Sequence, residues 1–319
     1  YRIGDKDLQV DQAFINALEV TLSKSRLDTY RTYFSCQNDA EALGTYLWNK
    51  SLSTAFYPLL QATEITLRNS IHSAASGHFS GNKEWFLMKK FPSAKKEADK
   101  QYLKNDRKTP ITPRPSSDTV VASLSFGFWV NLLTQNYDDP VKNTKLWPTL
   151  IPKVFPNAKS TNATRTALHH RFKFIKDFRN RVGHYEPIWK IRDTVDGGGN
   201  IIRLGPTTPE ESIIRLNEYV DLIAESLMWM SFERYDFIVG MGIIDHIRQL
   251  CSLEALSHFQ GTNPTKLKVN KLKHELSKRH KENGSVSGLY ELTTSPKGVH
   301  KGRSIVLEVK QIYPPRLIK

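Results

Sequence analysis

The sequence predicts a mainly α-helical protein that ends in a small, basic α+β appendage. Long stretches of its 319 residues carry apolar side chains at the three- and four-residue spacing of helices. Outside the appendage, only the segment around the glycine-rich turn at 196–200 has the pattern of a β-hairpin. From Gly261 onward, thirteen Lys and Arg residues stand against four Glu, so the composition of the last fifth of the chain differs from the rest.

The first helices are predicted from apolar spacing and capping residues. Residues 7–24 have helical periodicity, which the polar run Ser25–Asp28 breaks. A second apolar face extends over 40–76, with Asp39 as its expected N-cap and an interruption at Pro58.

Residues 89–117 have a different composition. Nine Lys and Arg residues stand against three acidic ones, and three prolines follow within six positions. This pattern predicts an exposed basic loop that is at most partly helical. A loop of this length serves either as a functional surface or as a solvated linker, and both interpretations stay open.

The remaining segments complete the helical prediction. Further helices are expected at 118–132, 162–185, 209–232 and 240–259, with the hairpin at about 188–204. In the appendage, a basic helix over 266–281 is expected to precede strands at 288–293 and 304–312. Two regions follow: a helical domain over 1–235 and a basic helix/strand region over 236–319.

Charge and cysteine content narrow the function. A formal net charge of +14 favours a polyanionic partner, although a basic surface without a ligand is the alternative. Cys36 and Cys251 are the only cysteines, and no Cys/His spacing resembles a zinc site. We therefore expect no metal, no cofactor and a reducing, cytoplasmic location. No apolar stretch is long enough to predict a membrane span.

Arg179, Asn180 and His184 form the candidate catalytic group, in the run FRNRVGHYEPIW. Asn180 and His184 lie four residues apart and share a helix face. The C-terminal end of a helix favours a protonated imidazole, which suits His184 to proton transfer near neutral pH. Phosphodiester transesterification needs such a group and a cation for the phosphate, and arginine suits the second role. The spacing alone is weak, because it recurs by chance in basic chains.

A second polar group occurs upstream. Glu64, Arg68 and His72 fall four residues apart on one helix stripe, with Asn69 beside them. Glu before Arg at this spacing favours an ordinary ion pair within the helix. The chain nevertheless contains two Arg-Asn pairs, each followed by a histidine and each in a largely apolar helix. Two such polar clusters could satisfy each other.

These blocks resemble a known family. The runs LWN at 47–49, LSTAFYPLLQ at 52–61 and LRN at 67–69, followed by SLSFGFW at 123–129 and FRNRVGHYEPI at 178–188, are similar to the Abi-like (abortive-infection) family of the HEPN superfamily. They cover about residues 20–232. The resemblance implies a HEPN-like helical bundle over 1–235. It also implies a metal-independent endoribonuclease that acts as a toxin or phage-defence effector and forms a homodimer.

The resemblance assigns roles to positions of this chain. Arg179 and His184 match the superfamily's Arg-X4–6-His signature, and Asn180 matches its polar residue. Glu64, Arg68 and Asn69 match the upstream block, with His72 as a further candidate. Gly183 departs from the expected alanine, which would loosen that helical turn.

RNA is the expected partner, as a substrate and as a captured small RNA. The cations expected to contact it are Lys95, Lys96, Arg107, Lys108, Arg171, Arg181, Lys271, Lys273, Lys278 and Arg279. The principal alternative is a non-catalytic RNA-binding protein that captures a cognate small RNA. A DNA-binding regulator is a third class, but no recognition-helix signature supports it.

Overall fold

The computed structural model describes residues 12–159, 161–195, 198, 200–261, 266–268, 271–283, 288–293 and 304–309. The described residues are mainly helical, which confirms the predicted fold class. The described helices are α1 (Gln12–Leu22), α2 (Lys24–Tyr33), α3 (Asp39–His78), α4 (Pro92–Asp99), α5 (Ser117–Ser123), α6 (Phe126–Asn131), α7 (Ile151–Val154), α8 (Arg165–Gly183), α9 (Pro209–Met230), α10 (Phe232–Gly240), α11 (Ile243–Leu250), α12 (Leu253–Gln260) and α13 (Leu272–Asn283). Short 3-10 turns η1 (Trp85–Leu87), η2 (Lys100–Tyr102) and η3 (Gln135–Tyr137) lie between them.

Two small sheets accompany the helices. β1 (Thr194–Val195) pairs antiparallel with β2 (Ile201–Arg203), which confirms the predicted hairpin. β3 (Lys266–Lys268), β4 (Gly288–Thr293) and β5 (Ser304–Val309) form a second sheet, parallel between β3 and β4 and antiparallel between β4 and β5. The appendage therefore contains both expected strands and the helix α13. The predicted start of that helix was too early, because β3 occupies 266–268.

Several predicted boundaries were wrong. The polar run at 25–28 lies inside α2, and the break falls at Ser23, whose hydroxyl accepts a hydrogen bond from the Arg26 amide. The N-cap of α3 is Asn38 rather than Asp39, because the Asn38 Oδ1 accepts the Glu41 amide at 2.9 Å. The expected helix at 118–132 is two helices, since Leu124 is extended and Ser125 caps α6. The segment 240–259 likewise divides, at Cys251–Ser252, into α11 and α12.

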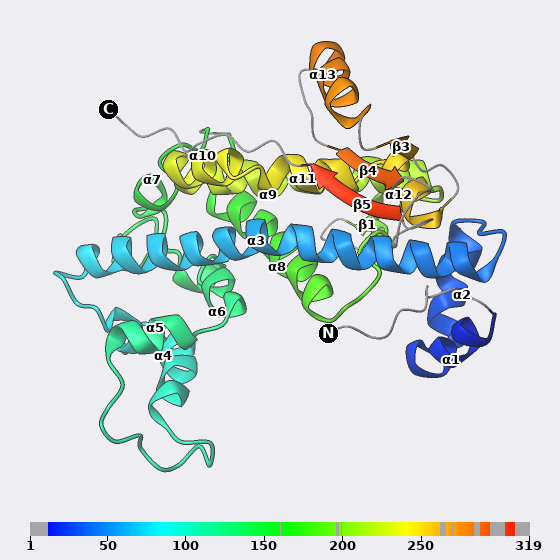
Figure 1. Ribbon diagram of the computed structural model, residues 1–319. Coiled ribbons are helices and arrows are strands. Elements are labelled where there is room, and N and C mark those ends of the chain that lie inside the picture. Colours follow the sequence, from blue (N-terminus) through cyan, green and yellow to red (C-terminus); the bar gives the residue numbers. More distant parts are fainter. Residues whose placement is uncertain are drawn as a thin grey trace. The chain divides into compact units, whose positions relative to one another are not determined.

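α3 is continuous for 40 residues, and Pro58 does not break it (Figure 1, blue to cyan). Leu52, Phe56, Leu59 and Leu60 around the proline are all buried. Burial of that apolar face offsets the one backbone hydrogen bond that proline removes.

The described chain divides into two compact units. The first comprises the described residues within 12–56, 185–220 and 239–309, and the second comprises those within 57–184 and 221–238. In the first unit, the ring of Trp189 packs on Tyr30, Tyr33 and Phe34, with centroid distances of 4.5–5.5 Å. In the second unit, Trp85 packs on Phe86 and Phe91. Both sets of aromatic rings build the cores that fix the helices around them.

Candidate functional site

α8 carries the predicted catalytic group to its C-terminal end. Thr164 caps the helix at its start, and its apolar face includes buried Phe172, Phe178 and Val182. At the other end, the His184 amide donates to the Asn180 carbonyl at 2.8 Å. His184 itself is exposed, while Arg179 and Asn180 are half-buried. The C-terminal end of α8 thus carries an exposed histidine, preceded by two half-buried polar side chains of the same helix.

Tyr185 ends the helix in an unusual conformation. Its φ of 58° lies in the left-handed region, where a side chain other than glycine is strained. The Lys50 ammonium lies 4.8 Å from the centre of the exposed Tyr185 ring. A left-handed residue directly after the C-cap commonly ends a helix, so Tyr185 determines where the chain leaves α8.

An ion pair joins the two polar groups that the sequence singled out. The Arg179 Nε lies 3.2 Å from the Glu64 Oε2, with side-chain exposures of 40% and 23%. α3 and α8 therefore bring the upstream and downstream blocks together. The contact is made through Nε of the guanidinium.

The arrangement on α3 differs from the predicted one. Spacing favoured a Glu64–Arg68 ion pair, but Glu64 pairs with α8 instead. The Arg68 Nε donates to the Asn69 Oδ1 at 3.1 Å. Packing of one helix against another decided this choice, which no spacing within α3 could show.

His72 points toward an aromatic cluster. Its Nδ1 accepts a hydrogen bond from the Trp85 indole at 3.3 Å, and the Phe86 ring is 6.3 Å away. Burial lowers the pKa of His72. The contacts account for His72 as a neutral hydrogen-bond acceptor, so we leave it out of the proposed catalytic group.

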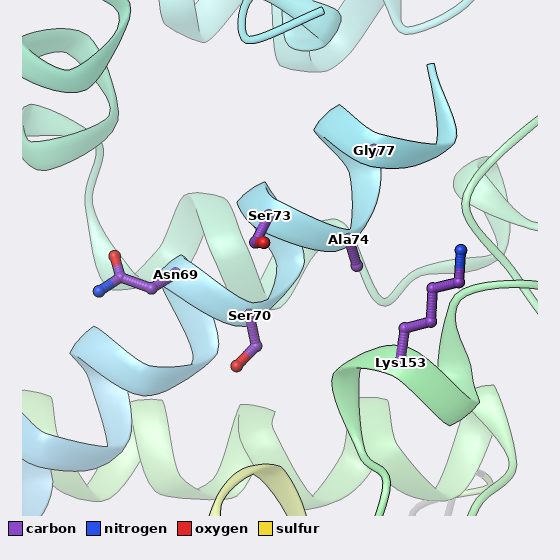
Figure 2. Close-up of a pocket in the computed structure, with 6 residues that line it drawn as sticks. All are labelled: Asn69, Ser70, Ser73, Ala74, Gly77 and Lys153. Carbon is purple, nitrogen blue, oxygen red and sulfur yellow. The ribbon is translucent and has the colours of Figure 1, made fainter. Parts of the chain in front are cut away.

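A shallow cavity of about 500 Å³ continues from Asn69 along α3. Figure 2 shows Asn69 at one side and Lys153 of α7 at the other. Ser70, Ser73, Ala74 and Gly77 line the space between them. Hydroxyl, amide and ammonium groups therefore border this cavity.

The cations expected to contact RNA fall into distinct settings. Lys96, Arg107 and Lys108 are exposed, whereas Lys95 pairs with Asp99 at 2.7 Å. Arg171 is held within the fold: its Nη1 lies 2.6 Å from the Glu225 Oε2. The remaining side chains are half-buried at Arg181 and exposed at Lys271, Lys273 and Lys278, whereas that of Arg279 in α13 lies outside the described residues.

Asn49 is a positioning residue to which the sequence analysis gave no role. It is 1% exposed, and its Oδ1 accepts the Ile188 amide at 3.0 Å. The Asn49 Nδ2 also lies 3.5 Å from the Glu186 carbonyl oxygen. The segment after His184 is therefore fastened to α3. A buried amide within the matched run LWN was the available signal, because buried polar groups need partners.

Two features are absent from the described part of the chain. No group of three or more His, Cys, Asp or Glu side chains there could hold a metal ion. None of the helices in this part of the chain is long and apolar enough to cross a membrane.

The fold and site define a helical protein in which polar side chains of α3 and α8 meet at the Arg179–Glu64 ion pair. The chain belongs to the Abi-like protein family, whose match covers residues 14–190. That match confirms the predicted resemblance, although it ends before α9. The family is associated with abortive-infection defence against phage. No curated protein and no solved structure matches the chain.

Proposed function

We propose that this protein is a metal-independent endoribonuclease of the HEPN type that acts as a toxin or phage-defence effector. The observation that carries the proposal is the Arg179–Glu64 ion pair, five residues before the exposed His184 at the end of the same helix. The C-terminal end of α8 thus carries a permanent cation and an exposed histidine, the two kinds of group that phosphodiester transesterification needs, which supports the proposal.

The chemistry requires no nucleophile from the protein. The RNA 2′-oxygen attacks the adjacent phosphorus while its proton passes to a base. The bond from phosphorus to the 5′ oxygen breaks, and that oxygen receives a proton. Products carry 2′,3′-cyclic phosphate and 5′-hydroxyl ends. His184 serves in proton transfer, Arg179 stabilises the charge on phosphate, and Asn180 orients one of them.

Glu64 supports the role of Arg179. Its carboxylate holds Nε, so the terminal nitrogens can form a two-pronged contact with phosphate oxygens. The cavity beside Asn69 offers hydrogen-bond donors for the flanking nucleotide.

We further propose a homodimer. One imidazole cannot accept the 2′ proton and deliver a proton to the 5′ oxygen at the same moment. A second copy of the chain would bring a second His184, as the composite sites of the HEPN superfamily imply.

Cleavage of RNA in excess EDTA tests the proposal. The wild-type chain should cut and leave cyclic phosphate ends, and His184→Ala should lose at least 100-fold in rate. His170→Ala is the matched control, because His170 is also exposed and lies on the same helix. An analogue with 2′-deoxy sugars should resist cleavage. Full activity in His184→Ala would overturn the assignment.

Non-catalytic capture of a small RNA is the second candidate. Exposed Lys271, Lys273 and Lys278 in and beside α13 favour it. RNA that co-purifies intact and dissociates when these lysines become Gln would support this function over cleavage.

A further inference from the structure

α4 and the segment after it form a basic groove of about 570 Å³. Lys89, Lys95, Lys96, Lys100 and Arg107 contribute cations to its lining, and Asp99 contributes the one carboxylate among the lining residues. The composition of residues 89–117 is compatible with either a functional loop or a solvated linker. The structure gives a helix, α4, a 3-10 turn, η2, and a loop after them (Figure 1).

The loop that carries Arg107 is held by its own hydrogen bonds. The Ile111 amide donates to the Tyr102 carbonyl at 2.9 Å, and the Lys104 amide donates to the Thr109 carbonyl at 2.8 Å. At the tip, Asp106 accepts from the Lys108 and Thr109 amides, both at 2.9 Å. Arg107 is therefore presented from a defined turn, unlike a side chain on a linker.

The base of the loop is also anchored. The Tyr102 hydroxyl donates to the Glu84 Oε1 at 2.8 Å, and the Arg114 Nη2 contacts the same oxygen at 2.8 Å. The Arg114 guanidinium stacks 4.4 Å from the centre of the Tyr102 ring. This contact occupies the Glu84 carboxylate and keeps it from neutralising the groove.

The other carboxylates near the groove are occupied as well. Asp99 pairs with Lys95 at 2.7 Å, and Glu97 pairs with Lys100 at 2.7 Å. Asp106 is committed to its turn, where hydrogen bonds from Thr109 and Lys108 lower its pKa. Lys89, Lys96 and Arg107 remain exposed and make no ion pair with any described residue.

We propose that this groove binds the backbone phosphates of a single RNA strand through Lys89, Lys96 and Arg107. The proposal rests on the proposed function, because it names a second contact region for the same substrate. Three uncompensated cations line one concavity, and each can contact a backbone phosphate, whose binding releases condensed counterions. The groove has the volume of a small-ligand pocket, which suits a short stretch of one strand.

The test measures binding of full-length protein to a single-stranded 2′-O-methyl RNA, which cannot be cleaved, as a function of salt. The variant combines Lys89→Gln, Lys96→Gln and Arg107→Gln. Loss of three phosphate contacts should reduce the slope of log affinity against log salt by about 2. Affinity at 0.1 M salt should fall about 100-fold, and the two proteins should converge near 1 M salt.

A matched control keeps the net charge equal. Lys24→Gln, Lys142→Gln and Arg192→Gln also remove three exposed cations, none of which lines the groove. This control should keep a wild-type salt slope within about 0.5. Equal losses in both triple variants, or none in the groove variant, would overturn the proposal. Polyglutamate that competes as well as RNA of equal charge would overturn RNA as the occupant.

Cleavage by the wild-type chain in EDTA separates this proposal from the proposed function. If the groove variant loses RNA affinity but the wild type never cuts RNA, the groove proposal is supported and the nuclease proposal is refuted. If the wild type cuts RNA but the groove variant binds RNA normally, the groove proposal is refuted and the nuclease proposal is supported. Equal thermal unfolding of both triple variants shows that neither result comes from misfolding.

Discussion

The variant Arg171→Ala tests whether Arg171 stabilises the folded protein or contacts RNA. Arg171 lies on α8, and its Nη1 contacts the Glu225 Oε2 at 2.6 Å. Its guanidinium carbon stacks 4.0 Å from the centre of the Trp229 ring. The side chain is 21% exposed, so these contacts are partly screened from water.

The loss of stability follows from those contacts. The ion pair, whose Glu225 partner is 40% exposed, contributes about 0.5–1 kcal/mol. Stacking on Trp229 adds about 1 kcal/mol. Contacts of Nη1 with the Leu222 carbonyl and the Ser226 hydroxyl, at 3.3 and 3.4 Å, add little, because two hydrogens cannot serve three acceptors well. We expect Arg171→Ala to lower the free energy of unfolding by about 2 kcal/mol.

Equilibrium unfolding in urea measures this loss. Lys173→Ala is the control on the same helix, since it removes one charge from an exposed pair with Asp177 and should cost under about 0.5 kcal/mol. Both variants should keep the wild-type salt slope of RNA binding. If Arg171→Ala is as stable as Lys173→Ala and its salt slope is reduced, the assignment to the fold is refuted.

Three further predictions concern the site and its helices. Glu64→Gln should lower kcat of RNA cleavage about 10-fold, because Arg179 loses its ion-pair partner. The free energy of unfolding should change by less than about 1 kcal/mol. An unchanged kcat would show that Glu64 does not belong to the site. The folded pKa of His72 lies below its unfolded value of about 6.5, so the unfolded state binds more protons and stability falls as pH drops through 6.5. Thermal unfolding between pH 7 and 5 should show a weaker decline in His72→Gln, and an equal decline would contradict the burial argument. Gly44→Ala should lower the free energy of unfolding by about 1–3 kcal/mol. Its Cβ would lie 2.0 Å from the Phe259 carbonyl oxygen, which is a backbone atom and cannot rotate away. A variant that is more stable in chemical denaturation would exclude this close approach.

Periodicity predicted the elements whose packing follows one apolar face. α8 and α9 appear within three residues of the expected 162–185 and 209–232. Prediction failed where tertiary contacts override local rules. Pro58 was treated as an interruption, yet the buried side chains around it keep α3 continuous. The division of 118–132 was missed because its apolar spacing continues across the turn that Ser125 caps.

The candidate site shows the same distinction between local and tertiary information. The residue types at 179–184 were enough to predict a catalytic group at the end of a helix. The sequence could not show that Arg179 pairs with Glu64, because that contact depends on how α3 and α8 pack. For the same reason, an arginine on α8 was assigned to RNA although its partners lie on α9. Charge reveals a cation, but only packing reveals whether that cation already has a partner.

The helix end that bears His184 is fixed more firmly than its glycine suggests. Gly183 departs from the expected alanine, yet the His184 amide still closes the last turn on the Asn180 carbonyl. Tyr185 then stops the helix in a left-handed conformation, and Asn49 holds the amide of Ile188. A Cβ on Gly183 would meet no atom within 4 Å, so its absence also relieves no crowding. The last turn of α8 thus closes with Gly183 in place, and the missing alanine is not evidence of an inactive site.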